Sequence, residues 1–246
     1  MNTMEKEWFA EWFDSPYYHI LYKNRDEKEA ETFINKLCSF IQLKPGNSIL
    51  DLACGKGRHS IFLNKKGFDV TGADLSVQNI NHAKKFKNDT LHFMVCDMRA
   101  LESENKYDVI LNLFTSFGYF ENEKDNIQTL HNLYRALKPG GILVIDFMNT
   151  HKVLENLISG ECKNIEGIDF CISRKFQNNC IIKEINFTND GKSHVYQEKV
   201  QALTHDTFKN YFQETGFIPT HVFGNYNLDE FNFSTSDRMI WMAQKK

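Results

Sequence analysis

Short apolar runs alternate with amphipathic segments through the middle of the chain, and this alternation constrains the fold more than any other feature. Each run is short enough for a buried strand; the runs are residues 48–53, 69–74, 91–96, 107–114 and 141–147. Apolar residues recur at helical spacing in the segments 59–66, 77–87 and 123–137. Nearly continuous apolar strands that alternate with helices indicate an α/β fold, a doubly wound parallel sheet covered on both faces.

Two helices are expected before this region. The first, over residues 4–13, has one strongly apolar face made by Trp8, Phe9, Trp12 and Phe13. Pro16 ends it, because proline disfavours helix in the residue before it. The second spans residues 26–41 and stops before Pro45. We take residues 1–43 as an N-terminal helical region.

The pattern changes after Asn149. A polar helical segment at 151–159 precedes three strand candidates at 168–176, 180–188 and 193–203, of which the last two flank an Asp190-Gly191 turn signal. Residues 162–203 therefore predict a small antiparallel sheet inserted into the parallel one. A helix at 204–215, capped by Thr204 and Gly216, and strands at 218–226 and 237–243 complete a single domain over residues 1–246.

The composition excludes several classes of protein. A net charge of -3 and a pI of about 6.3 give no general attraction to nucleic acid or anionic lipid. No apolar run is long enough to span a bilayer, and the acidic N-terminus does not resemble a signal peptide, so we expect a cytoplasmic protein. The six cysteines lack zinc-ligand spacing, so we expect no metal and mostly reduced, buried thiols.

The stretch ILDLACGKGRHS, residues 49–60, contains the strongest functional signal. Gly55 and Gly57 permit backbone angles that other residues resist and let a ligand approach the main chain. Backbone N–H groups at the start of the next helix can then face a carboxylate or phosphate. A structural turn without a ligand is the alternative.

Acidic residues at strand ends make the ligand interpretation stronger. Asp74 ends the second strand about twenty residues further on, where a carboxylate can accept both hydroxyls of a ribose. Asp97 ends the third strand and could accept the amino group of an adenine. Each could instead be a helix cap or a surface residue, but with Asp51 they place three carboxylates around one glycine turn.

The type of nucleoside follows from two residues. A nicotinamide dinucleotide favours a third glycine three places after Gly57, and this chain has Ser60 there. Asp51 would be poorly placed beside a pyrophosphate but well placed beside an ammonium group. The expected ligand is therefore an adenosine that bears an amino acid instead of phosphates.

At this point the sequence resembles the class I S-adenosylmethionine-dependent methyltransferases. LDLACGKGRHS looks like their first motif, and GADLS and CDMRAL look like the second and third acidic strand ends. YDVILNLFTSFGYF and LKPGGILVIDF resemble their fourth and fifth strands, with LKPGG as a helix end and a turn. The resemblance covers residues 48–147 firmly and implies a seven-stranded Rossmann-like sheet of order 3-2-1-4-5-7-6 with an antiparallel last strand.

The FTSFGYF segment and the inserted sheet are similar to small-molecule methyltransferases, including amino-sugar and glycine N-methyltransferases. The resemblance implies S-adenosylmethionine as cofactor and a small-molecule methyl acceptor. It implies these donor-binding residues: Asp51, Ala53, Gly55, Gly57, Arg58, Asp74, Leu75, Asp97, Met98 and Leu113. Arg58 could instead bind the acceptor or pair with Asp51.

Methyl transfer to a nitrogen or oxygen is an in-line displacement that needs alignment and exclusion of water more than a catalytic group. The chain lacks the Asn/Asp-Pro-Pro-Tyr/Phe motif of amino-methylating nucleic-acid enzymes after its fourth strand. The candidate positioning residues are Tyr18, His19, Tyr22 and Tyr119; the first three would belong to an N-terminal lid or simply pack on the sheet. Arg174 of the inserted sheet, the expected substrate cover, either contacts the acceptor or is solvated.

The sequence thus predicts a class I methyltransferase acting on a small molecule, with no nucleic-acid or membrane partner. A non-catalytic module that binds the donor or its demethylated product is one alternative. A dinucleotide-dependent oxidoreductase is the other, and Ser60 and Asp97 count against it. The acceptor and the oligomeric state cannot be read from the chain.

Overall fold

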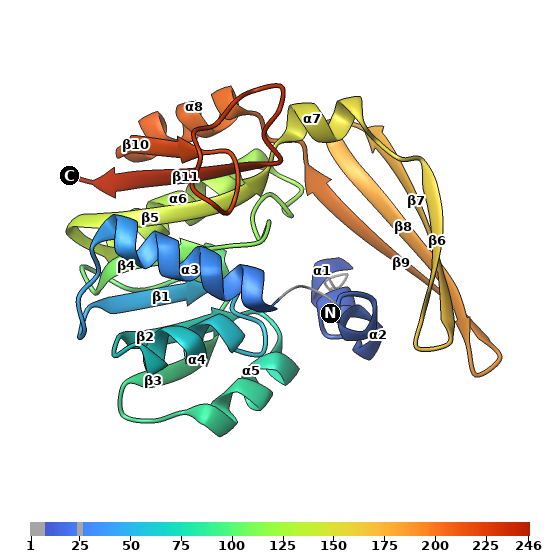
Figure 1. Cartoon of the computed structure of the whole chain (residues 1–246), viewed down its shortest axis with the longest axis horizontal. Helices are drawn as coiled ribbons and strands as arrows, with labels where there is room; N and C mark the ends of the chain where they lie inside the picture. Colours follow the sequence, from blue (N-terminus) through green and yellow to red (C-terminus); the bar gives the residue numbers. More distant parts are fainter. Residues whose placement is uncertain (1–7, 24–26) are drawn as a thin grey trace, which may run out of the picture.

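A computed structural model, which describes residues 8–23 and 27–246, contains two separate sheets (Figure 1). The larger has seven strands in this order: β10 (Phe217–Phe223), β11 (Arg238–Lys245), β5 (Leu137–Met148), β4 (Tyr107–Asn112), β1 (Ser48–Leu52), β2 (Asp69–Asp74) and β3 (Leu91–Val95). The pairs among β1 to β5 are parallel, and β11 runs antiparallel to β5 and β10. This confirms the predicted Rossmann-like order with an antiparallel last strand.

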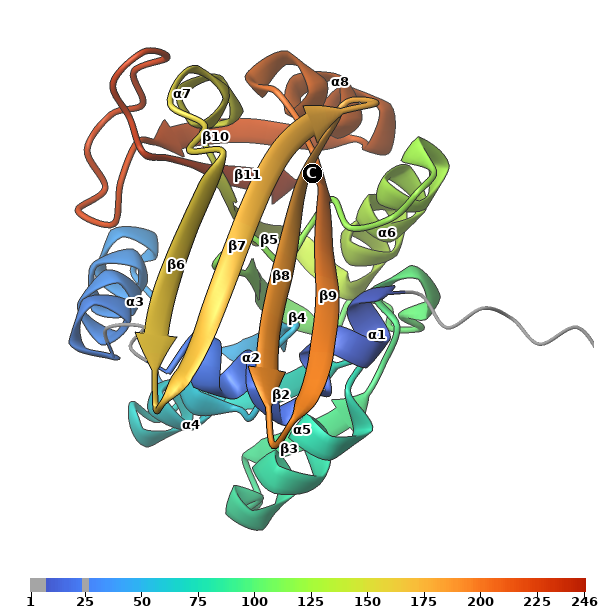
Figure 2. The same ribbon diagram turned by 90° about the vertical axis from the view of Figure 1, so that its right-hand side faces the viewer.

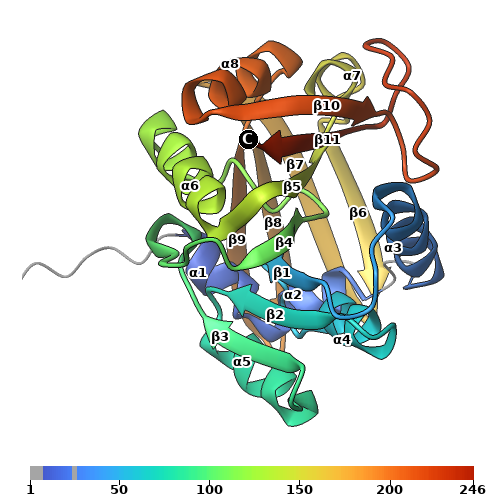
Figure 3. The ribbon, with the colours of Figure 1, turned by 90° about the vertical axis from the view of Figure 1, so that its left-hand side faces the viewer.

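Helices cover both faces of this sheet, as its apolar strands require. One core contains buried side chains of α3 (Glu27–Ile41), α4 (Arg58–Lys65) and α5 (Val77–Ala83). The other contains those of α6 (Glu123–Ala136) and α8 (His205–Thr215). Figure 3 shows α3 and α6 on opposite sides of the strands. The predicted caps of α8 are present, with Thr204 accepting from the Thr207 amide and Gly216 at a φ of 85°.

Several element boundaries differ from the prediction. The helix expected over 77–87 is α5 followed by a 3-10 turn, η1 (Lys84–Phe86), and another such turn, η2 (Met98–Ala100), follows β3. The LKPGG segment, predicted as a helix end and a turn, instead begins β5. Leu137 is fully buried and pairs with Tyr107, so strand pairing and burial override the local turn signal.

The inserted sheet has four antiparallel strands rather than three: β6 (Gly160–Ile165), β7 (Ile168–Gln177), β8 (Cys180–Asn189) and β9 (Lys192–Gln201) (Figure 2). The predicted turn at Asp190 and Gly191, both at positive φ, joins β8 to β9. The shorter α7 (Thr150–Glu155) precedes β6. β6 was not predicted because it is a mostly exposed edge strand without apolar alternation.

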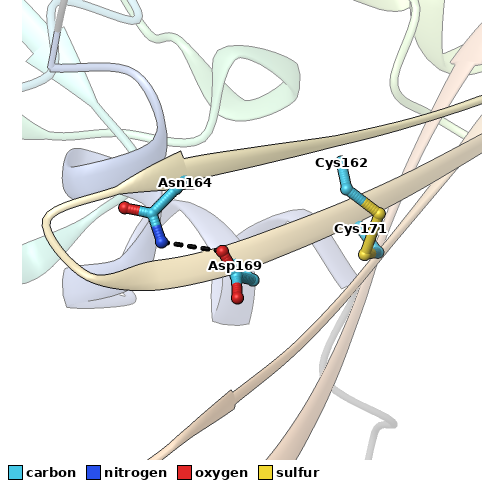
Figure 4. The surroundings of a disulfide bond; sticks show 4 residues. All are labelled: Cys162, Asn164, Asp169 and Cys171. Atoms are coloured by element: carbon cyan, nitrogen blue, oxygen red, sulfur yellow. Dashed lines mark hydrogen bonds between the residues drawn. A yellow bond between two sulfur atoms is a disulfide. The ribbon is translucent and has the colours of Figure 1, made fainter.

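The expectation of reduced cysteines is wrong for one pair. Cys162 of β6 lies directly opposite Cys171 of β7, and the two form a disulfide (Figure 4). Asn164 donates a 2.7 Å hydrogen bond to Asp169 further along the same strands. Because β6 was not predicted, nothing in the sequence placed the two thiols together. The other cysteines are free, and Cys38, Cys54 and Cys180 among them are buried.

The N-terminal helices α1 (Trp8–Phe13) and α2 (Pro16–Leu21) lie between the two sheets (Figures 1 and 2). Trp12 is 1% exposed and packs in an apolar cluster with the inner face of β7. The helix α2 was not predicted: Ser15 caps it and Pro16 is its first residue, so the proline that ends one helix begins another. Residues 4–7 of the expected first helix lie outside the described residues.

Within the described part of the chain, no helix combines the length and the apolar content needed to cross a bilayer.

Gly72 provides a test of the packing between β2 and α4. A Cβ atom at this position would lie 2.6 Å from the Phe93 ring and 2.8 Å from Ser60 Oγ. Gly72→Ala should therefore lower the free energy of unfolding by about 1–3 kcal/mol through overpacking, measured by urea denaturation. Gly160→Ala is the matched control, because its Cβ would meet only the Ile172 carbonyl at 3.7 Å. Equal stabilities for the two variants would contradict this packing.

Candidate functional site

Two cavities lie beyond the carboxyl ends of the parallel strands, where open α/β sheets bind ligands. The first, of about 160 Å³, is lined by residues after β1, β2, β3 and β4 and by the N-terminal helices. The second, of about 420 Å³, is lined partly by β7, β8 and β9. Phe114, Tyr119 and Glu198 line both, so the cavities meet at these three side chains.

The glycine turn forms one wall of the first cavity. Ala53, Gly55 and Gly57 all have positive φ, at 62°, 56° and 81°. A Cβ atom on Gly55 would meet nothing within 4 Å, so the backbone there is open to a ligand. Gly57 has a different role: its Cβ would lie 2.6 Å from Phe93, and the residue does not line the cavity. Gly57 permits close packing against Phe93, and Gly55 permits a ligand to approach the backbone closely.

Asp74, at the end of β2, is held by the turns on both sides. Its Oδ2 accepts a 2.8 Å hydrogen bond from the Gly55 amide, and its Oδ1 accepts one of 2.8 Å from the Ser76 amide. Burial raises the pKa of this carboxyl group, and the two backbone donors oppose the shift. Asp74 therefore presents a fixed, solvent-poor carboxylate to the cavity.

Asp97 caps the turn η2 after β3 and lines the same cavity. Arg99 donates to both of its oxygens, at 3.0 Å from Nε to Oδ1 and 2.6 Å from Nη2 to Oδ2. Burial opposes ionisation of Asp97, but Arg99 lowers its pKa. Met98 and Leu75 add apolar walls, so the predicted donor residues in this cavity are Ala53, Gly55, Asp74, Leu75, Asp97 and Met98.

The other predicted donor residues lie elsewhere. Asp51 is 3% exposed beneath the turn, where it accepts a 2.6 Å hydrogen bond from Ser60 Oγ. Leu113 is 5% exposed, and neither residue lines the first cavity. Arg58 lines the second cavity instead. Sequence spacing identified the strand ends correctly but could not tell which side chains face inward.

Three of the four predicted positioning residues line the first cavity: Tyr18, Tyr22 and Tyr119. The fourth, His19, lines neither cavity and bonds to Asn79, a cavity residue. Burial and then the nearby charge of Lys56 lower the pKa of His19. His19 therefore lies behind the cavity wall.

Glu198 of β9 is the main site residue that the sequence did not reveal. Its Oε1 accepts 2.7 Å hydrogen bonds from Trp12 Nε1 and from the Tyr22 hydroxyl. Lys183 Nζ lies 3.4 Å from Oε2 and also donates to the Tyr22 hydroxyl. These contacts join the N-terminal helices to the inserted sheet, and such long-range contacts leave no local pattern. Phe13 and Asn79 are cavity residues missed for the same reason.

A second connection runs from the N-terminal helices to the parallel sheet. The Ser76 hydroxyl donates a hydrogen bond to the carboxylate of Asp14, between α1 and α2. Because the Ser76 amide also bonds to Asp74, the helical region is fixed to the same loop as the cavity carboxylate.

The second cavity is rich in positive charge. Its lining includes four cations, Arg58, Arg174, Lys183 and Arg238, against two carboxylates, Glu29 and Glu198. Arg174 Nη2 donates to Glu161 of β6. Its Nη1 is buried and has no hydrogen-bond partner among the described residues. A buried donor of this kind calls for an acceptor, which a water molecule or a ligand in the adjoining cavity can supply.

The first cavity fits an adenosine carrying an amino acid. It offers an open backbone at Gly55, a fixed carboxylate at Asp74 and apolar walls for a flat purine at Leu75 and Met98. These features match the chemistry of S-adenosylmethionine, whose ribose, base and amino acid need such partners.

Comparisons with known proteins agree with this geometry. A family described as a methyltransferase domain matches residues 49–141. The chain is 35% identical to the glycine/sarcosine N-methyltransferase of Halorhodospira halochloris, covering 92% of this chain and 84% of that one. It is 33% identical, over 41% of its length and 42% of the other, to dTDP-3-amino-3,4,6-trideoxy-alpha-D-glucopyranose N,N-dimethyltransferase of Streptomyces venezuelae.

The fold is similar to that of a solved S-adenosylmethionine-dependent methyltransferase from Clostridium acetobutylicum. The TM-score is 0.79 at 21% identity, with 93% of this chain and 95% of that chain covered.

Asp74 provides the direct test of the first cavity. Asp74→Asn should weaken binding of S-adenosylmethionine about 10- to 100-fold, because a charge-assisted hydrogen bond contributes ~1.5–3 kcal/mol. Isothermal titration calorimetry measures the affinity, and circular dichroism checks the fold. Asp69→Asn is the control, at the exposed start of the same strand. Unchanged affinity in a folded Asp74→Asn protein would contradict the predicted ribose contact.

Asp51 predicts a pH dependence of stability. Burial raises the pKa of its carboxyl group from 3.8 to about 6, so the folded protein holds this proton more tightly than the unfolded chain does. The stabilisation is present below pH 4 and is lost as the pH rises towards 6, a difference of about 2–4 kcal/mol. Asp51→Asn should remove this contribution to the pH dependence of the unfolding free energy, which urea denaturation at several pH values between 4 and 7 measures. An identical pH dependence of the unfolding free energy in the two proteins would contradict the raised pKa of Asp51.

Proposed function

The chain belongs to the S-adenosylmethionine-dependent methyltransferase family, and we propose that its acceptor is a small amine that also carries a carboxylate or another anionic group. It is a methyltransferase that uses S-adenosylmethionine as methyl donor. We further propose that the first cavity holds the methyl donor and that the second holds the anionic group of the acceptor.

The buried Nη1 of Arg174 is the observation that carries the proposal. It belongs to a cavity that has four cationic side chains and meets the donor cavity at Phe114, Tyr119 and Glu198. An anionic group bound at Arg174 would satisfy this donor and leave the rest of a small acceptor near the junction. The 35% identity to a glycine/sarcosine N-methyltransferase supports a nitrogen as the methylated atom.

In this proposal the first cavity binds the donor. Asp74 accepts from the ribose hydroxyls, Asp97 and Met98 flank the adenine, and the backbone at Gly55 faces the amino-acid part. Asp51, buried beneath the turn, acts through the field of its carboxylate and through Ser60 rather than by direct contact. The N-terminal helices and the inserted sheet cover the two reactants.

The bound donor supplies an electrophilic methyl carbon on a positively charged sulfur. The amine nitrogen forms a bond to this carbon as the carbon–sulfur bond breaks, and the extra proton on the product nitrogen is lost to solvent. The protein's contribution is alignment and the exclusion of water. Phe114 and Tyr119 form the walls of the passage in which this alignment takes place.

An amino sugar is the second candidate acceptor. The similarity to a dTDP-amino-sugar N,N-dimethyltransferase favours it, but that similarity covers 41% of the chain, against 92% for the glycine/sarcosine N-methyltransferase. The non-catalytic module and the oxidoreductase find no support in the comparisons.

A substrate screen tests the proposal. Glycine, sarcosine and β-alanine should yield S-adenosylhomocysteine and methylated product, detected by mass spectrometry. Their matches without a carboxylate, glycinamide and ethanolamine, should react at least about tenfold more slowly, because they lack an anionic partner for Arg174. Faster methylation of these two amines, of an amino sugar without an anionic group or of a phenol would contradict the proposal.

Arg174 itself provides the matched variant. Arg174→Gln should raise the KM for the anionic amine about 10- to 100-fold, through loss of a charge-assisted contact, with a smaller change in KM for the donor. Lys175→Gln is the control, because Lys175 is the next residue of β7 and is exposed. Steady-state kinetics with each substrate varied measures both constants. Equal effects of the two substitutions would contradict a contact between Arg174 and the acceptor.

A further inference from the structure

The loop after β4 contains two consecutive residues in an unfavourable backbone conformation. Phe114 and Thr115 both have a φ of 59°, in the left-handed region that favours glycine. The conformation is costly for any side chain and most costly for a β-branched residue such as Thr115. Such a turn persists only where surrounding contacts hold it.

The backbone of this turn is held by one buried residue, Asp146. Asp146 of β5 is 0% exposed. Its Oδ2 accepts a 2.8 Å hydrogen bond from the Phe114 amide, and its backbone carbonyl accepts one of 3.0 Å from the Thr115 amide. Both strained residues are therefore bonded to the same residue of a neighbouring strand.

Arg238 of β11 fixes the carboxylate and the turn together. Its Nε lies 2.8 Å and its Nη2 2.7 Å from Asp146 Oδ1, and Nη2 also donates to Thr115 Oγ1 at 2.8 Å. The Tyr226 hydroxyl donates to Asp146 Oδ2 at 3.2 Å. The planar guanidinium group thus binds Asp146 through two nitrogens and Thr115 through one of them, an arrangement that the single nitrogen of a lysine cannot reproduce.

The result of this arrangement is the placement of the Phe114 ring. The ring lies between the two cavities and lines both. It stacks on His59, with ring centres 4.8 Å apart, and contacts the rings of Tyr226 and Phe33. In a relaxed backbone conformation the side chain would leave this position, because the direction of the Cα–Cβ bond depends on φ and ψ.

We propose that Asp146 and Arg238 are positioning residues for methyl transfer, which hold the Phe114–Thr115 turn in its left-handed conformation and so keep the Phe114 ring at the junction of the donor and acceptor cavities. The alignment of the two reactants then depends on an ion pair that contacts neither reacting atom. This inference rests on the assignment of the two cavities in the proposed function.

The test uses Arg238→Lys, which keeps a positive charge beside Asp146 but removes the bridge to Thr115. Hydrogen exchange measured by mass spectrometry on a peptide covering residues 112–119 should be about tenfold faster in this variant. The kcat/KM for the amine most active in the screen should fall about 10- to 100-fold, while the Kd for S-adenosylhomocysteine changes less than about threefold. Asp237→Asn, at an exposed carboxylate one residue away, is the control and should change none of these values.

A second-site substitution separates positioning from general destabilisation. Thr115→Gly removes the backbone penalty at φ 59°, so the double variant Arg238→Lys/Thr115→Gly should recover at least about tenfold of the lost kcat/KM. A general loss of stability would not be repaired in this way. Asp146→Asn should change hydrogen exchange and kcat/KM in the same way as Arg238→Lys. If Asp146→Asn does not fold, the comparison of Arg238→Lys with Arg238→Lys/Thr115→Gly decides.

Three results would overturn the inference: unchanged exchange of residues 112–119, faster exchange with unchanged kcat/KM, or no recovery in the double variant. The exchange measurement needs no acceptor. Failure of the proposed acceptor class would therefore leave the exchange result intact, whereas failure of this inference would appear in the exchange itself.

Discussion

The hydrogen bond from the Gly55 amide to the Asp74 carboxylate is the contact on which the site depends. It ties the turn after β1 to the end of β2, so that an open stretch of backbone and a carboxylate face the same cavity. The parallel pairing of β1 and β2 places both groups at one edge of the sheet. Ser76 extends the connection to Asp14, so the covering helices are anchored to the same loop.

The parallel sheet could be predicted from the sequence because local patterns determine it. Apolar runs gave the strands, helical spacing gave the helices, and the glycine turn gave the position of the first cavity. Prediction failed where long-range packing decides. Asp51 and Leu113 occupy promising sequence positions but lie beneath the surface, and LKPGG joins a strand because Leu137 is buried against its neighbour.

The second cavity and the inserted sheet were far harder to predict from the sequence. β6 has no apolar alternation, so neither the disulfide between Cys162 and Cys171 nor the contact of Arg174 with Glu161 could be anticipated. Glu198 accepts hydrogen bonds from partners more than 170 residues away, Trp12 and Tyr22. These residues lie outside the parallel sheet, in keeping with function residing in sites added to a common fold.

The most direct test of the account is a crystal structure with S-adenosylhomocysteine and an anionic amine bound together. We expect the ribose at Asp74, the sulfur facing the passage between Phe114 and Glu198, and the anionic group within hydrogen-bond distance of Arg174 Nη1. A nucleoside bound away from the glycine turn, or an amine whose anionic group points away from Arg174, would contradict it.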